Sequence, residues 1–169
     1  MVGKTGLSYR LINYHPNNDN EPTLCENIKT ILKIDDKDYE LEIFESYDTE
    51  GYPHLFDLFI SFADGILLLF AINNEKSFKF IKDNYDKIIK VKHGNKCPML
   101  LVGNKLDLEN EREVSYTEAK LLTEEWGIEY MEISVKNNLN CKEVFEKLAK
   151  EIVKIKNFKP KKKTCCTII

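Results

Sequence analysis

Two apolar runs that flank a helix-like pattern constrain the fold of this chain more than any other feature. Residues 65–72 carry no polar side chain, and residues 98–102 repeat the pattern. A strand that is apolar throughout must be covered on both faces, as in parallel sheets flanked by helices. Between the two runs, apolar side chains recur at helical spacing at Phe78, Ile81, Tyr85, Ile88 and Ile89, with Gly94 beyond them. This region therefore predicts a strand–helix–strand unit.

The rest of the chain fits the same architecture. Residues 29–34 and 39–44 alternate polar and apolar side chains around residues 35–37, which predicts two strands joined by a tight turn. Other expected elements are a short helix through Leu7, Leu11 and Ile12, a helix between a Ser115/Glu118 capping box and Gly127, a strand at 130–133, and a helix capped by Asn140 and Glu143. Such alternation predicts one α/β domain with a mostly parallel sheet flanked by helices.

Charge and cysteine usage exclude several classes of function. The net charge of -3, with charges mixed along the chain, argues against a nucleic-acid-binding protein. The five cysteines are Cys25, Cys97, Cys141, Cys165 and Cys166, without the C-x-x-C spacing of a zinc or redox site. We therefore expect a reducing, cytosolic compartment. The longest apolar run is far shorter than the roughly 20 residues of a membrane-spanning helix.

Two polar loops that follow apolar strands carry the most specific chemistry. Residues 104–107 read Asn-Lys-Leu-Asp directly after the second apolar run. The Asp107 carboxylate can accept two hydrogen bonds from the N–H groups of guanine, whereas adenine presents an acceptor there. The Lys105 stem can lie along the base, and the Asn104 amide can hold the loop in place. An ordinary polar turn would account for this tetrapeptide alone, but residues 134–136, Ser-Val-Lys, follow the next strand in the same way.

A third loop stands at the beginning of the chain. Gly3, Lys4 and Thr5 match the end of a phosphate-binding loop, in which the lysine neutralises the β- and γ-phosphates and the hydroxyl binds magnesium. This tripeptide is a weak signal by itself. Pro22 and Thr23 follow farther along the chain, after a polar segment.

These motifs, together with residues 70–73 and 102–105 in the same register, resemble the Ras-family small GTPases of the Ras and Rap type over essentially the whole chain. The resemblance implies a P-loop NTPase (Ras-like) fold, GTP or GDP with Mg²⁺ as cofactors, and GTP hydrolysis as the reaction. The implied nucleotide-binding residues are Gly3, Lys4, Thr5, Asn104, Lys105, Asp107, Ser134, Val135 and Lys136. The implied magnesium residues are Thr5, Thr23 and, indirectly, Glu45. The implied effector segment is Thr23, Leu24, Cys25, Glu26, Asn27 and Ile28.

The chain departs from the family pattern at its beginning. It starts two residues before the second glycine of G-x-x-x-x-G-K-[ST], so that the first glycine and the preceding apolar strand are missing. In the Ras fold that strand lies between the strands expected at 39–44 and 66–72. Its loss would remove ladder hydrogen bonds and buried apolar side chains that together stabilise the fold by about 10 kcal/mol. A typical domain is stable by only about 5 to 15 kcal/mol. We therefore expect a sheet that lacks its first central strand and is marginally stable, and hypothesise a missed upstream start or exon.

A second departure affects hydrolysis. Where the family has D-T-A-G-Q, the register places residues 45–49, which begin with Glu45 and end with Thr49. Thr49 replaces the glutamine that orients the attacking water. Asp48 replaces a glycine whose N–H reaches the γ-phosphate, and Pro16 replaces an aromatic residue against guanine. We expect GTP hydrolysis to be slow or lost; drift in a decaying copy would explain the same changes.

The C-terminus predicts a lipid anchor. Lys154, Lys156, Lys159, Lys161, Lys162 and Lys163 precede a C-a-a-X signal on Cys166, with Cys165 as a candidate for palmitate. A prenyl chain and basic residues together hold a protein on an anionic membrane. We expect a Ras-like domain at 1–153 and a polybasic, prenylated tail at 154–169, anchored at the cytoplasmic face of the plasma membrane or an endomembrane. A solvated basic tail with chance cysteines is the alternative.

Together these features predict a monomeric Ras-like small GTPase in signal transduction. Its expected partners are effector proteins, exchange factors, GTPase-activating factors and a membrane, with no nucleic acid. The first alternative is a pseudo-GTPase, a prenylated binding module that does not switch on nucleotide. The second is an inactive truncated product.

Overall fold

A computed structural model of the chain describes residues 2–12, 28–45, 53–94, 96–156 and 163–169. Its helices are α1 (Lys4–Leu11), α2 (Pro53–Phe62), α3 (Glu75–Val91), the 3-10 helix η1 (Leu106–Glu111), α4 (Tyr116–Trp126) and α5 (Cys141–Lys156). Its strands are β1 (Ile28–Ile34), β2 (Lys37–Glu45), β3 (Gly65–Ala71), β4 (Met99–Asn104), β5 (Glu129–Glu132) and β6 (Lys163–Ile168). The predicted α/β class is confirmed.

The described strands form one six-stranded sheet in the order β1-β2-β6-β3-β4-β5. Strands β1 and β2 pair in antiparallel, with Ile28 opposite Ile43 and Ile34 opposite Lys37. Their turn places Asp35 at φ 46° and Asp36 at φ 62°, the backbone of a tight hairpin turn. All other neighbours in the sheet are parallel, so the predicted hairpin and the mostly parallel sheet are both confirmed.

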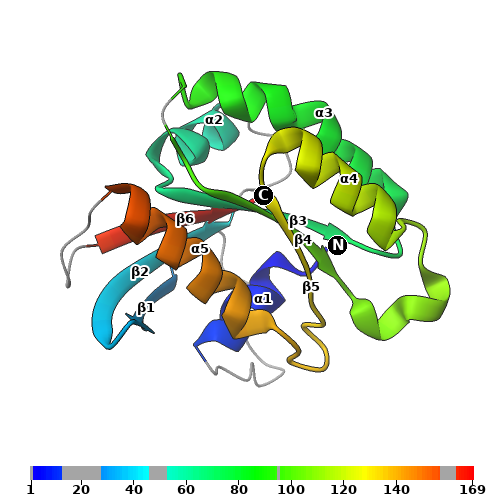
Figure 1. Ribbon diagram of the computed structural model, residues 1–169, viewed down its shortest axis with the longest axis horizontal. Coiled ribbons are helices and arrows are strands. Elements are labelled where there is room, and N and C mark those ends of the chain that lie inside the picture. The colour runs from blue at the N-terminus through cyan, green and yellow to red at the C-terminus, as the bar shows by residue number, and fades with distance from the viewer. Residues whose placement is uncertain (1, 13–27, 46–52, 95, 157–162) are drawn as a thin grey trace.

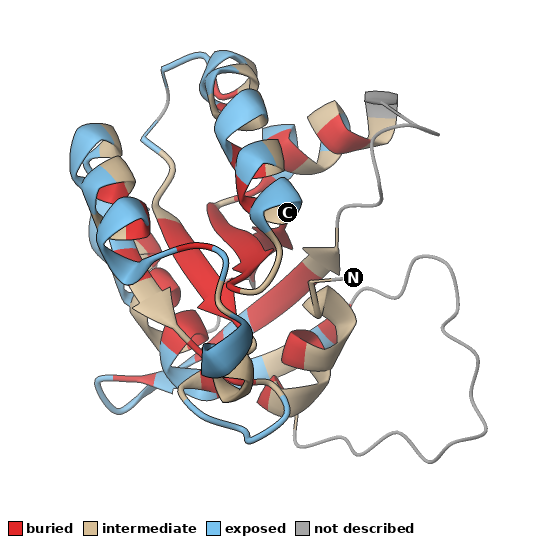
Figure 2. Ribbon diagram, turned by 90° about the vertical axis from the view of Figure 1, so that its right-hand side faces the viewer, coloured by how far each residue is buried: buried red, intermediate tan, exposed pale blue. Residues whose placement is uncertain are grey.

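Helices cover both faces of the sheet (Figure 1). Alternate side chains of β3 show why: Leu67 and Leu69 join one core with residues of α1 and α5, while Ile66, Leu68 and Phe70 join a second core with residues of α2 and α3. Figure 2 shows the resulting pattern, with buried strands in the middle and exposed residues on the outer faces of the helices. The fully apolar β3 is therefore a strand buried on both faces, as its sequence predicts.

The helices follow most of the expected signals. The Ser115 hydroxyl accepts a hydrogen bond from the Glu118 N–H at the beginning of α4, as predicted. Helix α3 begins at a cap that was not predicted, in which the Asn74 side chain accepts a hydrogen bond from the Ser77 N–H. Asn140 behaves differently: its side-chain amide donates to the Glu132 carbonyl oxygen at 2.9 Å. Helix α2 was not predicted, because its sequence carries apolar side chains on the exposed side, such as Phe62, as well as on the buried side, such as Phe56.

The expectation of a gap in the sheet was wrong. Strand β6, from the C-terminus, lies between β2 and β3 and is parallel to both, with Glu42 opposite Cys165 and Leu67 opposite Ile168. The position in which the family places its first strand is thus occupied from the other end of the chain. Residues 163–168, expected in a tail outside the domain, are a central strand here.

Candidate functional site

The loops singled out in the sequence meet at the carboxyl ends of the parallel strands. Asn104 is the last residue of β4, Ser134 comes two residues after the end of β5, and α1 begins at Lys4. Open α/β sheets bind their ligands at this edge, outside the carboxyl ends of the strands. The candidate site is therefore defined by three segments: residues 2–5, 104–107 and 134–136.

Asn104 joins all three segments. Its side-chain Nδ2 donates a hydrogen bond to the Val2 carbonyl oxygen at 2.8 Å, and its Oδ1 accepts one from the Val135 N–H at 3.1 Å. The residue is only 2% exposed. Both ends of this amide are thus used to hold the phosphate-loop segment and the Ser-Val-Lys loop in one arrangement.

Asp107 is held against the Ser-Val-Lys loop. The Ser134 hydroxyl donates to Asp107 Oδ1 at 2.5 Å, and Lys136 Nζ lies 3.9 Å from Oδ2. Ser134 Oγ in turn accepts a hydrogen bond from the Asn137 N–H at 3.1 Å. The Asp107 side chain is 10% exposed, so most of it is removed from water. Lys105, at φ 70°, turns the backbone from β4 into η1.

Arg10 belongs to the site, although the sequence analysis did not identify it. Its Nε and one terminal nitrogen donate to the carbonyl oxygens of Val135 and Lys136 at 2.8 and 2.9 Å. These bonds anchor the Ser-Val-Lys loop to α1 through its carbonyl oxygens. A cation in the last turn of the helix after Gly-Lys-Thr was the available signal.

Arg112 holds the helix that carries Asp107. Its guanidinium donates two hydrogen bonds to Glu132, at 2.8 and 2.9 Å, and two to Glu109, at 2.8 and 2.5 Å. These bonds, to Glu132 first and then to Glu109, raise the pKa of Arg112 above its usual range. The Tyr130 hydroxyl also donates to Glu132, at 2.6 Å. The network ties η1 to β5 and so holds the loops at residues 104–107 and 134–136 at a fixed separation.

The predicted magnesium residues Thr5 and Glu45 lie together. Thr5 Oγ1 donates a hydrogen bond to Glu45 Oε2 at 2.6 Å, although the two residues are 40 positions apart. A hydroxyl and a carboxylate are the oxygen ligands that Mg²⁺ prefers, so the pair fits this ion. The described residues contain no cluster of three or more His, Cys, Asp and Glu side chains that would offer a different site.

The C-terminus occupies the sheet position in which the Ras resemblance places the strand before the phosphate loop. Strand β6 runs parallel to β3 and ends beside Leu67, and the Leu69 N–H donates to the Ile169 carbonyl oxygen at 2.9 Å. The central strand of the sheet is thus supplied by residues that follow α5 in the chain.

Gly3 is required by geometry, which supports a direct prediction. It adopts φ 96°, and a Cβ there would lie 2.5 Å from Asn104 Nδ2. Gly3→Ala should therefore lower the free energy of unfolding by more than the roughly 1 to 2 kcal/mol of left-handed backbone strain, because Asn104 must also move. Urea unfolding at equilibrium measures the change.

Gly127→Ala is the matched control for that substitution. Gly127 has φ 66° and ends α4, but a Cβ there meets no heavy atom within 4 Å. Gly127→Ala should lower the free energy of unfolding by the backbone strain alone, because no neighbouring atom has to move. Equal losses in the two variants would contradict the contact assigned to Asn104.

Several predicted residues lie outside the described part of the chain. These are the effector and magnesium residues Thr23, Leu24, Cys25, Glu26 and Asn27, the altered loop residues Asp48 and Thr49, and Pro16. Of the expected effector segment, Ile28 is described: it begins β1 and is buried. The roles given to the others remain predictions.

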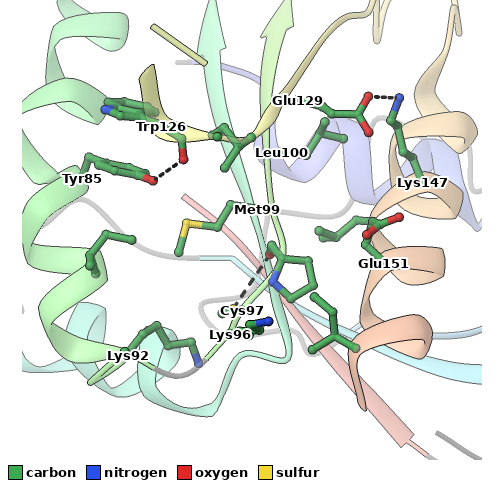
Figure 3. Close-up of a pocket in the computed structure, with 17 residues that line it drawn as sticks. Tyr85, Lys92, Lys96, Cys97, Met99, Leu100, Trp126, Glu129, Lys147 and Glu151 are labelled. Carbon is green, nitrogen blue, oxygen red and sulfur yellow. Dashed lines mark hydrogen bonds and ion pairs between the residues drawn. The ribbon is translucent and has the colours of Figure 1, made fainter. Parts of the chain in front are cut away.

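A pocket of about 500 Å³ lies at the opposite edge of the sheet (Figure 3). Its walls include Met99 at the beginning of β4 and Glu129 at the beginning of β5. The rings of Tyr85 and Trp126 stack with centroids 3.8 Å apart, and Lys147 pairs with Glu129. Because this pocket lies at the amino ends of the strands, it is not the site formed by the three loops.

The fold and the three loops define the class of protein: an α/β nucleotide-binding domain of the P-loop type. The family model described as the Ras family matches residues 1–154, and the chain belongs to this family. It is thus a small GTPase-like, GTP-binding protein. Ras-family proteins in general bind guanine nucleotide with Mg²⁺ and interact with effectors, exchange factors and GTPase-activating proteins.

Proposed function

We propose that this chain binds GTP and GDP with Mg²⁺ and acts in signal transduction by recruiting effector proteins at a membrane. The observation that carries the nucleotide part is the Asn104 junction, which holds the phosphate-side and base-side loops together through hydrogen bonds of 2.8 and 3.1 Å. A chain that did not bind guanine would have no physical reason to hold Asp107 in this arrangement.

Each loop has a role in the proposal. Lys4 and the N–H groups at the beginning of α1 would meet the β- and γ-phosphates, because a helix N-terminus favours anions. Thr5 and Glu45 would hold the Mg²⁺ ion, which neutralises phosphate charge. Asp107 would accept hydrogen bonds from the guanine N–H groups. In the loop of Ser134 to Lys136, the first two N–H groups donate to Leu139 and Asn104, so the Lys136 N–H would reach the guanine oxygen.

Membrane recruitment and slow hydrolysis complete the proposal. No helix in the described ranges is both long and apolar enough to cross a bilayer. A prenyl group on Cys166 and the lysines from Lys154 to Lys163 would supply attachment, each lysine near an anionic leaflet adding about 1 kcal/mol. Thr49, in place of the family glutamine, makes slow or absent GTP hydrolysis the expected behaviour.

Titration calorimetry of the purified full chain tests the nucleotide part. GDP and a non-hydrolysable GTP analogue, each with magnesium, should bind with a dissociation constant of micromolar or lower, and ADP should not bind measurably. The physical reason is that the Asp107 carboxylate pairs with guanine N–H groups and repels the acceptor that adenine presents.

Circular dichroism before the titration makes a negative result interpretable. Absence of binding by a folded chain would contradict the proposal and favour a prenylated binding module without a nucleotide switch. Equal binding of ADP and GDP would contradict only the role of Asp107 in selecting guanine and would leave nucleotide binding itself in place.

A further inference from the structure

The C-terminal strand is buried in the centre of the sheet. Thr164, Cys166, Thr167, Ile168 and Ile169 are each at most 3% exposed. Cys166 and Ile168 belong to the core that contains α1 and α5, and Ile169 belongs to the core that contains α2 and α3. The end of β6 and the residue after it thus fill both cores, as a central strand does.

Asp64 binds β6 near its beginning. Its backbone N–H donates to the Cys165 carbonyl oxygen at 2.8 Å, and its Oδ2 accepts from the Cys165 N–H at 2.9 Å. Its other carboxylate oxygen pairs with Lys156, at the end of α5. Asp64 lies just before β3, so it joins α5, β6 and β3 at one point.

Two contacts hold the rest of the strand. The Thr167 hydroxyl donates to the Phe59 carbonyl oxygen of α2 at 3.1 Å. The Ile169 N–H donates to the Leu67 carbonyl oxygen at 2.9 Å, beside the reciprocal bond from Leu69. The last residue of the chain is therefore paired within the sheet.

Lipid attachment needs the same residues in a different environment. Prenyl transfer forms a thioether between Cys166 Sγ and the first carbon of an isoprenyl diphosphate; pyrophosphate leaves and the thiol proton is released. In the folded chain the thiol is 1% exposed, and burial raises its pKa well above the ordinary value, which disfavours the reactive thiolate. A core packed around a cysteine has no room for an isoprenoid chain.

We propose that β6 is a displaceable central strand whose insertion between β2 and β3 excludes lipid attachment at Cys166. With β6 inserted, the sheet is continuous from β2 to β3 and the chain carries no lipid anchor. With β6 withdrawn, Cys166 is open to modification, and the lipid then prevents return of the strand. Insertion into the sheet and attachment to a membrane are therefore mutually exclusive states of residues 163–169. The lipid half of this inference rests on the proposed function; the insertion half does not.

Thiol labelling of the full chain tests insertion. A small alkylating reagent at low conversion, with peptide mapping by mass spectrometry, should modify Cys166 at least roughly tenfold more slowly than the less buried neighbour Cys165. In concentrated urea the two rates should be alike. Similar rates in the native chain would overturn the proposal.

Substitutions at Asp64 leave the C-a-a-X residues intact and test displacement. Asp64→Ala removes the hydrogen bond to the Cys165 N–H and the pair with Lys156, and should accelerate both Cys166 labelling and prenyl transfer roughly tenfold or more. Asp83→Ala is the control, because Asp83 pairs with Lys79 on the exposed face of α3. If Cys166 in Asp64→Ala were labelled and prenylated at the same rates as in the parent chain, the proposed dependence of modification on strand withdrawal would be overturned.

Two valine variants distinguish an inserted strand from a free tail without any labelling. Thr164 Oγ1 is buried without a hydrogen-bond partner, whereas Thr167 Oγ1 is bonded to Phe59. Thr164→Val should raise the urea midpoint and Thr167→Val should lower it. A free tail would leave both midpoints unchanged and overturn the proposal. Because none of these readouts uses nucleotide, loss of GDP binding alone would contradict only the proposed function.

Discussion

Asp107→Ala is expected to lower the affinity for GDP roughly a hundredfold or more. A hydrogen bond to a charged group contributes about 1.5 to 3 kcal/mol, and the carboxylate would accept two from guanine. The alanine removes both bonds and leaves the guanine N–H groups without partners in a site shielded from water. Calorimetric titration of the variant and the parent chain, with magnesium present, measures the ratio of dissociation constants.

Two further variants separate base recognition from damage to the loops. Glu111→Ala removes an exposed carboxylate from the same 3-10 helix and should leave the affinity unchanged. Ser134→Ala removes the 2.5 Å hydrogen bond to Asp107 but keeps the carboxylate, so it should cost far less than Asp107→Ala. If Asp107→Ala bound GDP as tightly as the parent chain, guanine recognition by this residue would be excluded.

Arg112→Met is expected to lower the free energy of unfolding by about 3 kcal/mol. Removal of one partner from a largely buried ion pair leaves the other charge uncompensated, which typically costs about 3 to 5 kcal/mol. Here the side chains of Arg112 and Glu132 are only 15% and 11% exposed. Equilibrium urea unfolding followed by circular dichroism measures the loss.

The network that Arg112 holds together also offers its own controls. Arg112→Met combined with Glu132→Gln removes both charges of the buried pair and should recover part of the stability. The carboxylate that still loses its arginine partner, Glu109, is 58% exposed and remains solvated. Lys142→Met breaks an exposed pair with Glu146 on α5 and should cost at most about 0.5 kcal/mol. A loss of that small size in Arg112→Met would show that the network does not stabilise the fold.

Local patterns account for much of what was predicted. The apolar run of β3, the turn at Asp35 and Asp36, and the cap at Ser115 are signals within a few residues, and each element lies where its signal indicated. The candidate loops were also found from short motifs, because parallel strands bring their carboxyl ends to one edge of the sheet. The structure brings Val2, Asn104 and Val135 together there.

Other features had no local signal strong enough to identify them. Helix α2 carries apolar side chains on its exposed side as well as its buried side, such as Phe62 and Phe56, so its period was obscured. Arg10 reads as an ordinary helix-end cation, and only its bonds to residues more than 120 positions away reveal its role. Side-chain partners at such separations depend on how the helices pack on the sheet.

The class of fold, the family and the loops proposed to bind guanine and phosphate could be predicted from the sequence, because these depend on short motifs and on the alternation of strands and helices. The strand that lies between β2 and β3 could be identified only in the folded chain. Residues 163–168 carry β-branched side chains suited to a strand, yet the same residues contain a lipidation signal. Parallel pairing of β6 joins it to partners about 100 positions away in β3 and about 120 positions away in β2, and no local pattern encodes pairing over such separations.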